Sequence, residues 1–237
     1  MKKHIPNILT CGNVLLGALA VVFAIKGFLL IAALLILGAA FFDFLDGFAA
    51  RLLNIKSVIG ADLDSLADVI SFGLAPAAIL FMWMDFCFVN LPPELQFFPL
   101  TILPYFAFIV VPFSAYRLAK FNNDERQEHD FCGLPTPANA FFIAFLPFAA
   151  DYLPFLDNFW ILLGLTSIFS ILLLIDLPMF SLKFFTYGFK RNWARYLFLI
   201  LSAFLLGTFQ LAAFPLIILL YIFISLIQFG LTKVLQQ

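Results

Sequence analysis

The sequence predicts an all-α protein that crosses a membrane several times. Hydrophobic residues make up 64% of the 237 residues and charged residues only 11%, and the mean hydropathy is +1.08. A soluble domain contains roughly one quarter charged residues, so this chain has too little polar surface to fold in water. The bilayer is therefore its expected solvent, and we expect one membrane domain over residues 1–237.

About eight apolar runs are long enough to cross a bilayer as helices. They lie near residues 8–25, 28–52, 60–84, 98–119, 137–150, 158–177, 193–209 and 212–233. The fifth run is the shortest and is interrupted by Pro147, and a tight turn is expected near Gln210. Lys2 and Lys3 precede the first run as they would in a secretion signal, but its polar residues favour a retained helix.

Basic residues set the expected orientation. If the N-terminus is cytoplasmic and eight helices cross, only Lys26 among the basic residues lies outside, whereas Asp85, Glu94, Asp151 and Asp157 lie on the outer side. Cytoplasmic loops carry an excess of Lys and Arg. The pattern therefore predicts a multi-pass protein of the cell membrane with both termini in the cytoplasm.

Charge and cysteine content exclude other classes of protein. The formal net charge is −1. The chain therefore lacks the excess of basic residues that would suggest a nucleic-acid partner. The three cysteines, Cys11, Cys87 and Cys132, are too few and too scattered for a disulfide framework or a zinc site.

Four carboxylates stand out in the stretch DFLDGFAARLLNIKSVIGADLDSLAD, residues 43–68. Asp43 and Asp46 are three residues apart near the end of the second run, and Asp64 and Asp68 are four apart at the start of the third, so each pair shares a helix face. A chain reversal brings all four to one place near the cytoplasmic surface. Unscreened carboxylates would repel one another there, and two Mg²⁺ or Mn²⁺ ions would remove the repulsion and suit phosphoryl chemistry.

Neighbouring residues strengthen this interpretation. Gly47 lets a ligand approach the helix backbone closely, and Gly60 does the same or lets helices close up. Arg51 lies one turn after Gly47 and can donate two hydrogen bonds to a phosphate. A single Asp at a helix end is more often a capping or interfacial residue, and Asp62 and Asp176 fit that description.

The pattern D-x2-D-G-x2-A-R-x8-G-x3-D-x3-D is typical of the CDP-alcohol phosphotransferases, and this chain resembles that family at every fixed position. Those positions are Asp43, Asp46, Gly47, Ala50, Arg51, Gly60, Asp64 and Asp68. The segment IPNILTCGN, residues 5–13, is similar to the start of the family's first helix.

Three further segments resemble the phosphatidylserine synthase branch of the family. They are DSLADVISFGLAP (64–76), YRLAKFN (116–122) and GLPTP (133–137). The resemblance covers about residues 1–145, which would form the catalytic part. Residues 146–237 are recognisable only as additional transmembrane helices.

The resemblance implies how each residue of the motif would act. The four aspartates would hold two metal ions on the diphosphate of CDP-diacylglycerol, and Asp68 would also be the general base. Gly47, Ala50, Arg51 and Gly60 would line the site for the CDP-diacylglycerol donor. Polar side chains of the first run either hydrogen-bond the cytidine or serve as helix-cap and packing residues. These are Asn7, Thr10 and Asn13.

The branch resemblance implies L-serine as the acceptor and phosphatidylserine and CMP as the products. The serine carboxylate needs a cation, for which Arg117 is the first candidate and Lys120 the second, with Ser71 and Thr136 as weaker ones. The alternative role of Arg117 is an anchor at the membrane surface. The resemblance also suggests a homodimer.

Two alternatives remain open on the sequence. The same chemistry can use another acceptor, glycerol 3-phosphate or an inositol phosphate, although phosphorylated acceptors call for more basic residues near the site. A divalent-cation transporter would also need clustered acids, but transporters usually show internal repeats and ligands near mid-membrane. The aspartate pairs D-x2-D and D-x3-D of the first half are not repeated in the second half of this chain.

Overall fold

The computed structural model describes residues 4–54, 58–123, 131–180 and 188–235, and their secondary structure is almost entirely helical. The α-helices are α1 (Ile5–Ile25), α2 (Leu29–Leu52), α3 (Val58–Asp68), α4 (Ala75–Val89), α5 (Val110–Asn123), α6 (Thr136–Ala149), α7 (Phe159–Leu174), α8 (Phe189–Phe209) and α9 (Ala213–Leu235). The other elements are the π-helix η2 (Val69–Leu74), the 3₁₀-helices η3 (Pro93–Leu95), η4 (Leu100–Ile109), η6 (Pro154–Leu156) and η7 (Gln210–Ala212), and the strands β1 (Phe131–Cys132) and β2 (Pro178–Met179).

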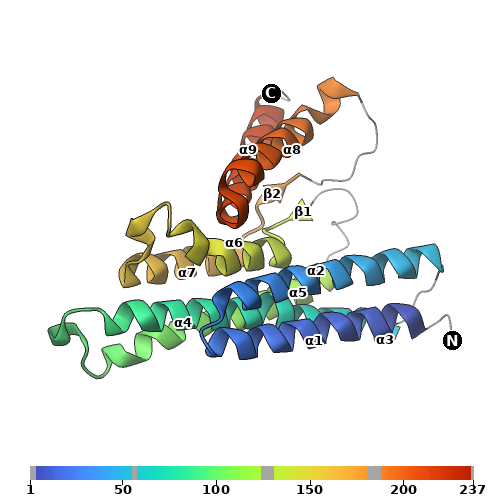
Figure 1. The fold of residues 1–237 in the computed structure, drawn as a ribbon. Helices are drawn as coiled ribbons and strands as arrows, with labels where there is room; N and C mark the ends of the chain where they lie inside the picture. The colour runs from blue at the N-terminus through green and yellow to red at the C-terminus, as the bar shows by residue number, and fades with distance from the viewer. Residues whose placement is uncertain (1–3, 55–57, 124–130, 181–187, 236–237) are drawn as a thin grey trace.

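The helices form a bundle with a separate hairpin above it. In Figure 1, α1, α2, α4 and α5 run side by side, α6 and α7 lie over them, and α8 and α9 rise from the bundle at a steep angle. The start of α1, the end of α2 and α3 meet at one end of the bundle. The turn expected near Gln210 is η7, which joins α8 to α9.

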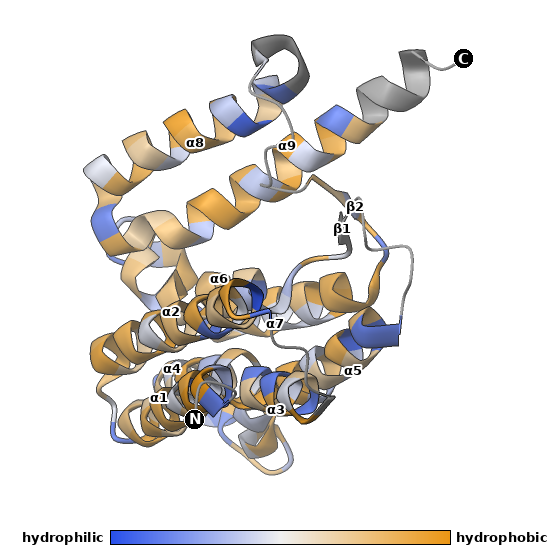
Figure 2. Cartoon of the chain, turned by 90° about the vertical axis from the view of Figure 1, so that its right-hand side faces the viewer, coloured by the Kyte–Doolittle hydropathy of each residue, from blue (hydrophilic) through white to orange (hydrophobic). Residues whose placement is uncertain are grey.

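Every helix is dominated by hydrophobic residues, and hydrophilic residues gather near α3 and the end of α5 (Figure 2). Within the described residues, five helical stretches are long and apolar enough to cross a membrane. They are Ile5–Ile25, Leu29–Leu52, Ile59–Val89, Leu100–Asn123 and Asn192–Phe229. The last covers most of α8 and most of α9, and α6 and α7 are shorter apolar helices.

Large apolar side chains also cover the outside of the bundle. Leu15 on α1, Phe44 on α2 and Phe204 on α8 are each about 60% exposed, as expected of surfaces that face lipid. An all-α, multi-pass membrane protein is therefore confirmed. The total of eight crossings and the cytoplasmic side of the termini stay predictions.

Small residues let α1 approach its neighbours closely. Gly12 faces the ring of Phe42 on α2, and Gly17 faces Ser71 on η2. A Cβ atom at Gly17 would lie 2.8 Å from the Cα of Ser71, a backbone atom that no rotamer change can move. Close backbone approach through small residues is the usual way in which membrane helices associate. The position of α1 against η2 therefore depends on Gly17.

We expect Gly17→Ala to lower the free energy of unfolding by about 1–3 kcal/mol, the usual cost of overpacking a tight contact. Gly164→Ala is the matched control, because Gly164 is exposed on α7 and a Cβ there would meet nothing within 4 Å. Thermal unfolding of the two variants in detergent measures the difference. Equal midpoints would show that the α1–η2 contact tolerates an extra methyl group.

Candidate functional site

Three of the four predicted aspartates meet in space. Asp43 on α2 and Asp64 and Asp68 on α3 each offer a carboxylate oxygen, and these oxygens lie within 4.8 Å of one another. The side chains of Asp43 and Asp64 are within hydrogen-bonding distance, and Asp64 Oδ1 is buried without a protein partner. Ionised carboxylates this close repel one another, and a divalent cation bound between them would offset that repulsion.

The fourth aspartate, Asp46, lies one turn after Asp43 on α2, and its side chain is buried. Its Oδ2 is 2.7 Å from the hydroxyl oxygen of Thr10 on α1. That hydroxyl also lies 3.0 Å from the carbonyl oxygen of Pro6, so its single hydrogen can be donated to either acceptor. Thr10 therefore orients Asp46 toward the face where α1 and α2 meet.

Asn13, one turn further along α1, reaches the other acidic helix. Its side-chain nitrogen donates to Asp68 Oδ1 at 3.4 Å, and its side-chain oxygen is buried without a protein partner. Since α1 packs against α2, α3 and η2, it forms a third wall of the acidic site. The sequence assigned Thr10 and Asn13 to cytidine binding or packing, and the structure shows both on carboxylates.

The donor set fits a hard divalent cation. It consists of carboxylate oxygens, with an unpartnered amide oxygen from Asn13 nearby, and it contains no thiolate or imidazole from the described residues. Oxygen ligands of this kind suit Mg²⁺ or Mn²⁺ and are poor ligands for softer metals. The structure thus contains an acidic cluster able to hold a metal ion.

A π-helix follows the acidic cluster directly, and the sequence analysis did not foresee it. Residues Val69–Leu74 form η2 immediately after Asp68. A π turn holds more residues than an α turn and often marks a functional site. The hydroxyl of Ser71 donates to the carbonyl oxygen of Asn13 at 3.0 Å. Ser71, a candidate for serine binding, is therefore directed at α1.

The residues expected at the CDP-diacylglycerol donor lie beside the cluster at the end of α2. Gly47 and Ala50 are half-buried and Arg51 is exposed. A Cβ at Gly47 would lie 4.0 Å from the terminal nitrogens of Arg51, so the guanidinium lies over this glycine. Gly60 on α3 and Asn7 on α1 are also half-buried.

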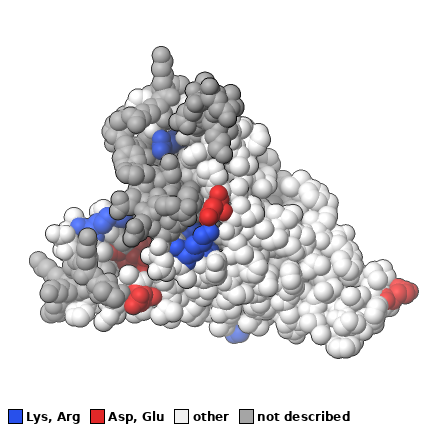
Figure 3. All heavy atoms as spheres, turned by 180° about the vertical axis from the view of Figure 1, so that it is seen from behind, with Lys and Arg blue, Asp and Glu red and all other residues white. Residues whose placement is uncertain are grey.

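Charged side chains are unevenly distributed on the face shown in Figure 3. On the face shown in Figure 3, most charged side chains lie in the half of the molecule that holds the start of α1 and the end of α2. The rest of that face is almost entirely uncharged. The charged side chains of this face therefore gather toward the end of the bundle that holds the acidic cluster.

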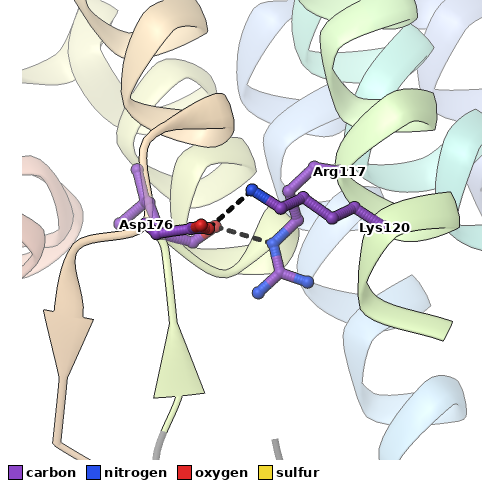
Figure 4. Close-up of polar contacts among 4 residues, drawn as sticks. Arg117, Lys120 and Asp176 are labelled. Atoms are coloured by element: carbon purple, nitrogen blue, oxygen red, sulfur yellow. Dashed lines mark hydrogen bonds and ion pairs between the residues drawn. The ribbon is translucent and has the colours of Figure 1, made fainter. Parts of the chain in front are cut away.

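The candidate acceptor residues Arg117 and Lys120 lie on α5 (Figure 4). Arg117 is 6% exposed, and its Nε donates to the carbonyl oxygen of Leu134 at 3.1 Å. Its guanidinium also stacks 4.8 Å above the ring centre of Phe121. Lys120 pairs with Asp176 at 2.6 Å. Arg117 is therefore enclosed by neighbouring parts of the protein.

A hydrogen bond links this part of α5 to the acidic helix. The side-chain nitrogen of Asn122 donates to the hydroxyl of Ser65 at 2.7 Å, and Ser65 directly follows Asp64. Two of the segments that resemble the phosphatidylserine synthase branch therefore contact each other. This contact places the candidate acceptor helix against the candidate metal site.

Sequence reasoning missed two buried polar residues near these helices. Asn139 on α6 is fully buried, and neither its side-chain oxygen nor its nitrogen has a protein partner; Ser114 on α5 is in the same state. Thr136, which was predicted, lies one turn before Asn139, and its hydroxyl is also unpartnered. The sequence did offer a signal for both: Asn139 lies one helical turn after Thr136, and Ser114 lies one turn before Arg117.

Comparison with known proteins agrees with the geometry. The model of the CDP-alcohol phosphatidyltransferase family matches residues 3–177. This chain belongs to that family. The match extends past residue 145, where the recognisable motifs end, and stops before α8.

Curated relatives carry related names. The CDP-diacylglycerol–serine O-phosphatidyltransferase of Helicobacter pylori is 30% identical over 176 residues, which is 70% of each chain. The protein of that name from Bacillus subtilis is 32% identical over 62% of this chain and 76% of its own length. The archaetidylserine synthase of Methanothermobacter thermautotrophicus is 34% identical over 57% of this chain and 54% of its own.

We expect Thr10→Val to weaken metal binding by about 10–100-fold, because groups that orient a metal ligand have effects of that size. Thr10→Ser, which keeps the hydroxyl, should retain most of the affinity. Thr208→Val is the matched control, since Thr208 is exposed on α8 and bonds only its own helix. Mn²⁺ titrations followed by electron paramagnetic resonance give the affinities. Unchanged Mn²⁺ affinity in Thr10→Val would exclude the hydroxyl as a support of the metal site.

Proposed function

We propose that this protein transfers the phosphatidyl group of CDP-diacylglycerol to the hydroxyl of L-serine, giving phosphatidylserine and CMP. The observation that carries the proposal is the convergence of Asp43, Asp64 and Asp68 within 4.8 Å, on the motif of the matched family. The names of the curated relatives support serine as the acceptor.

The four aspartates, including Asp46, would hold two divalent cations, Mg²⁺ or Mn²⁺. When bound, the cations neutralise charge on the diphosphate and on the departing CMP. Thr10 fixes Asp46, and Asn13 fixes Asp68. Because both donors are uncharged, they orient the carboxylates without reducing the negative charge that attracts the cations.

Asp68 is the proposed general base. Asp68 is 9% exposed, and Asn13 donates to its Oδ1. The serine oxygen attacks the phosphorus that bears the diacylglycerol, its proton passes to Asp68, and the bond from that phosphorus to the CMP oxygen breaks. Arg51, beside Gly47 at the end of α2, would bind the donor phosphates.

The charges on α5 favour a carboxylate over a phosphate in the acceptor. Asp176 pairs with Lys120, so Arg117, Lys120 and Asp176 together carry one net positive charge. A single charge suits the carboxylate of serine, whereas glycerol 3-phosphate or an inositol phosphate brings a doubly charged group. Arg117 is the proposed partner of the serine carboxylate, and Thr136 is a further candidate contact.

The surroundings of the site complete the proposal. The active site opens toward the cytoplasm, which the distribution of basic residues supports. The chain acts as one domain in the bilayer, as a homodimer. The cation transporter is the weaker alternative, because the matched family consists of transferases and the acidic cluster lies at one end of the bundle.

The experiment that tests this function is CMP release by purified protein with CDP-diacylglycerol and a panel of alcohols. We expect release with L-serine and Mg²⁺ or Mn²⁺, and little with glycerol 3-phosphate or inositol phosphate. Excess chelator should abolish release, and added Mn²⁺ should restore it. A strong preference for a phosphorylated alcohol would refute the serine assignment, and full turnover in chelator would refute the metal site.

Asp68→Asn should reduce kcat by at least about 10²–10⁴-fold, the usual contribution of a general base. Binding of CDP-diacylglycerol should change much less, because the other three aspartates remain. Asp62→Asn is the matched control, since Asp62 is exposed on the same helix. Turnover is measured by CMP release and donor binding by equilibrium dialysis. A loss of binding as large as the loss of rate would make Asp68 chiefly a metal ligand.

A further inference from the structure

The C-terminal hairpin, which lies beyond the family match, makes a specific contact with the rest of the protein. The hydroxyl of Tyr221 on α9 donates to the carbonyl oxygen of Phe180 at 2.8 Å. Tyr221 is 8% exposed, and its ring packs edge-on against Phe180, with centres 5.0 Å apart. Phe198 of α8 packs against both rings. The end of β2 is therefore held by both helices of the hairpin.

Strand β2 transmits this contact to the segment before α6. Met179 pairs with Phe131 in the antiparallel ribbon, and the amide of Gly133 donates to the carbonyl oxygen of Leu177 at 2.7 Å. Gly133 has a φ of +86°, which favours glycine. The ribbon thus fixes the path of the chain where it turns from β1 toward α6.

The two segments that flank the ribbon contact the basic side chains of α5, Arg117 and Lys120. After β1, the carbonyl oxygen of Leu134 accepts from Arg117, and before β2, Asp176 pairs with Lys120 (Figure 4). Leu134 is fully buried, and it directly follows Gly133, whose amide bonds Leu177 at the ribbon. A continuous series of contacts therefore runs from Tyr221 through β2, β1 and Leu134 to Arg117.

We propose that Tyr221 is a positioning residue for the acceptor: through the β1–β2 ribbon it holds the guanidinium of Arg117 in the orientation that binds the acceptor carboxylate. The proposal rests on the function proposed above, in which Arg117 binds serine. It gives the C-terminal helices a role in the acceptor half of the reaction. The residues proposed to bind the CDP-diacylglycerol donor, on α1, α2 and α3, take no part in the contacts that run from Tyr221 to Arg117.

Tyr221→Phe tests the proposal, because it removes the hydroxyl and keeps the buried ring. We expect the KM for serine to rise about three- to tenfold, the effect of one neutral hydrogen bond. The kcat and the KM for CDP-diacylglycerol should stay within twofold. Tyr152→Phe is the matched control, since Tyr152 is exposed and contacts Phe209 through its ring.

Arg117→Ala, measured in parallel, separates the two proposals. If Arg117→Ala raises the serine KM and Tyr221→Phe does not, the positioning role is wrong and the proposed function stands. If Arg117→Ala leaves the serine KM unchanged, the acceptor role of Arg117 fails and the positioning role with it. If Tyr221→Phe raises the KM for serine and the KM for CDP-diacylglycerol equally and lowers the unfolding temperature, the effect is a general structural one. That result would also overturn the proposal.

Discussion

The structure depends on the repulsion among Asp43, Asp64 and Asp68, whose oxygens meet within 4.8 Å in a chain that is 64% hydrophobic. Burying like charges together is unfavourable unless a cation joins them. The cluster therefore belongs at the end of the bundle, where cations and nucleotides can reach it. For the carboxylates to meet, the end of α2 must lie level with the start of α3. The link between the two helices spans only residues 53–57.

Holding this cluster also requires a third helix at very short range. A threonine or asparagine side chain reaches a carboxylate only when the two backbones approach closely. Gly12 and Gly17 permit that approach, because neither carries a Cβ that would meet Phe42 or Ser71. The close packing of α1 and the orientation of the acids are thus one feature of the fold.

The sequence predicts the helices and the acidic faces, because hydrophobic runs and spacings of three or four residues are local properties. It does not predict which helices become neighbours. Thr10 and Asn13 were therefore left between cytidine binding and a capping or packing role, and their bonds to Asp46 and Asp68 were not foreseen. The π-helix after Asp68 was missed because Gly73 within it and Pro76 just after it do not by themselves distinguish a π turn from an α-helix.

The contacts divide the proposed reaction between two parts of the bundle. The proposed donor residues lie on α1, α2 and α3, whereas Arg117, the proposed acceptor residue, bonds Leu134 beside the ribbon that α9 contacts through Tyr221. The two parts meet where Asn122 of α5 bonds Ser65, next to Asp64. On the proposed roles, a change in the C-terminal hairpin would affect the acceptor residue Arg117, while the aspartates of the acidic cluster would keep their contacts with α1. This separation is consistent with a family match that ends at residue 177, before the hairpin begins.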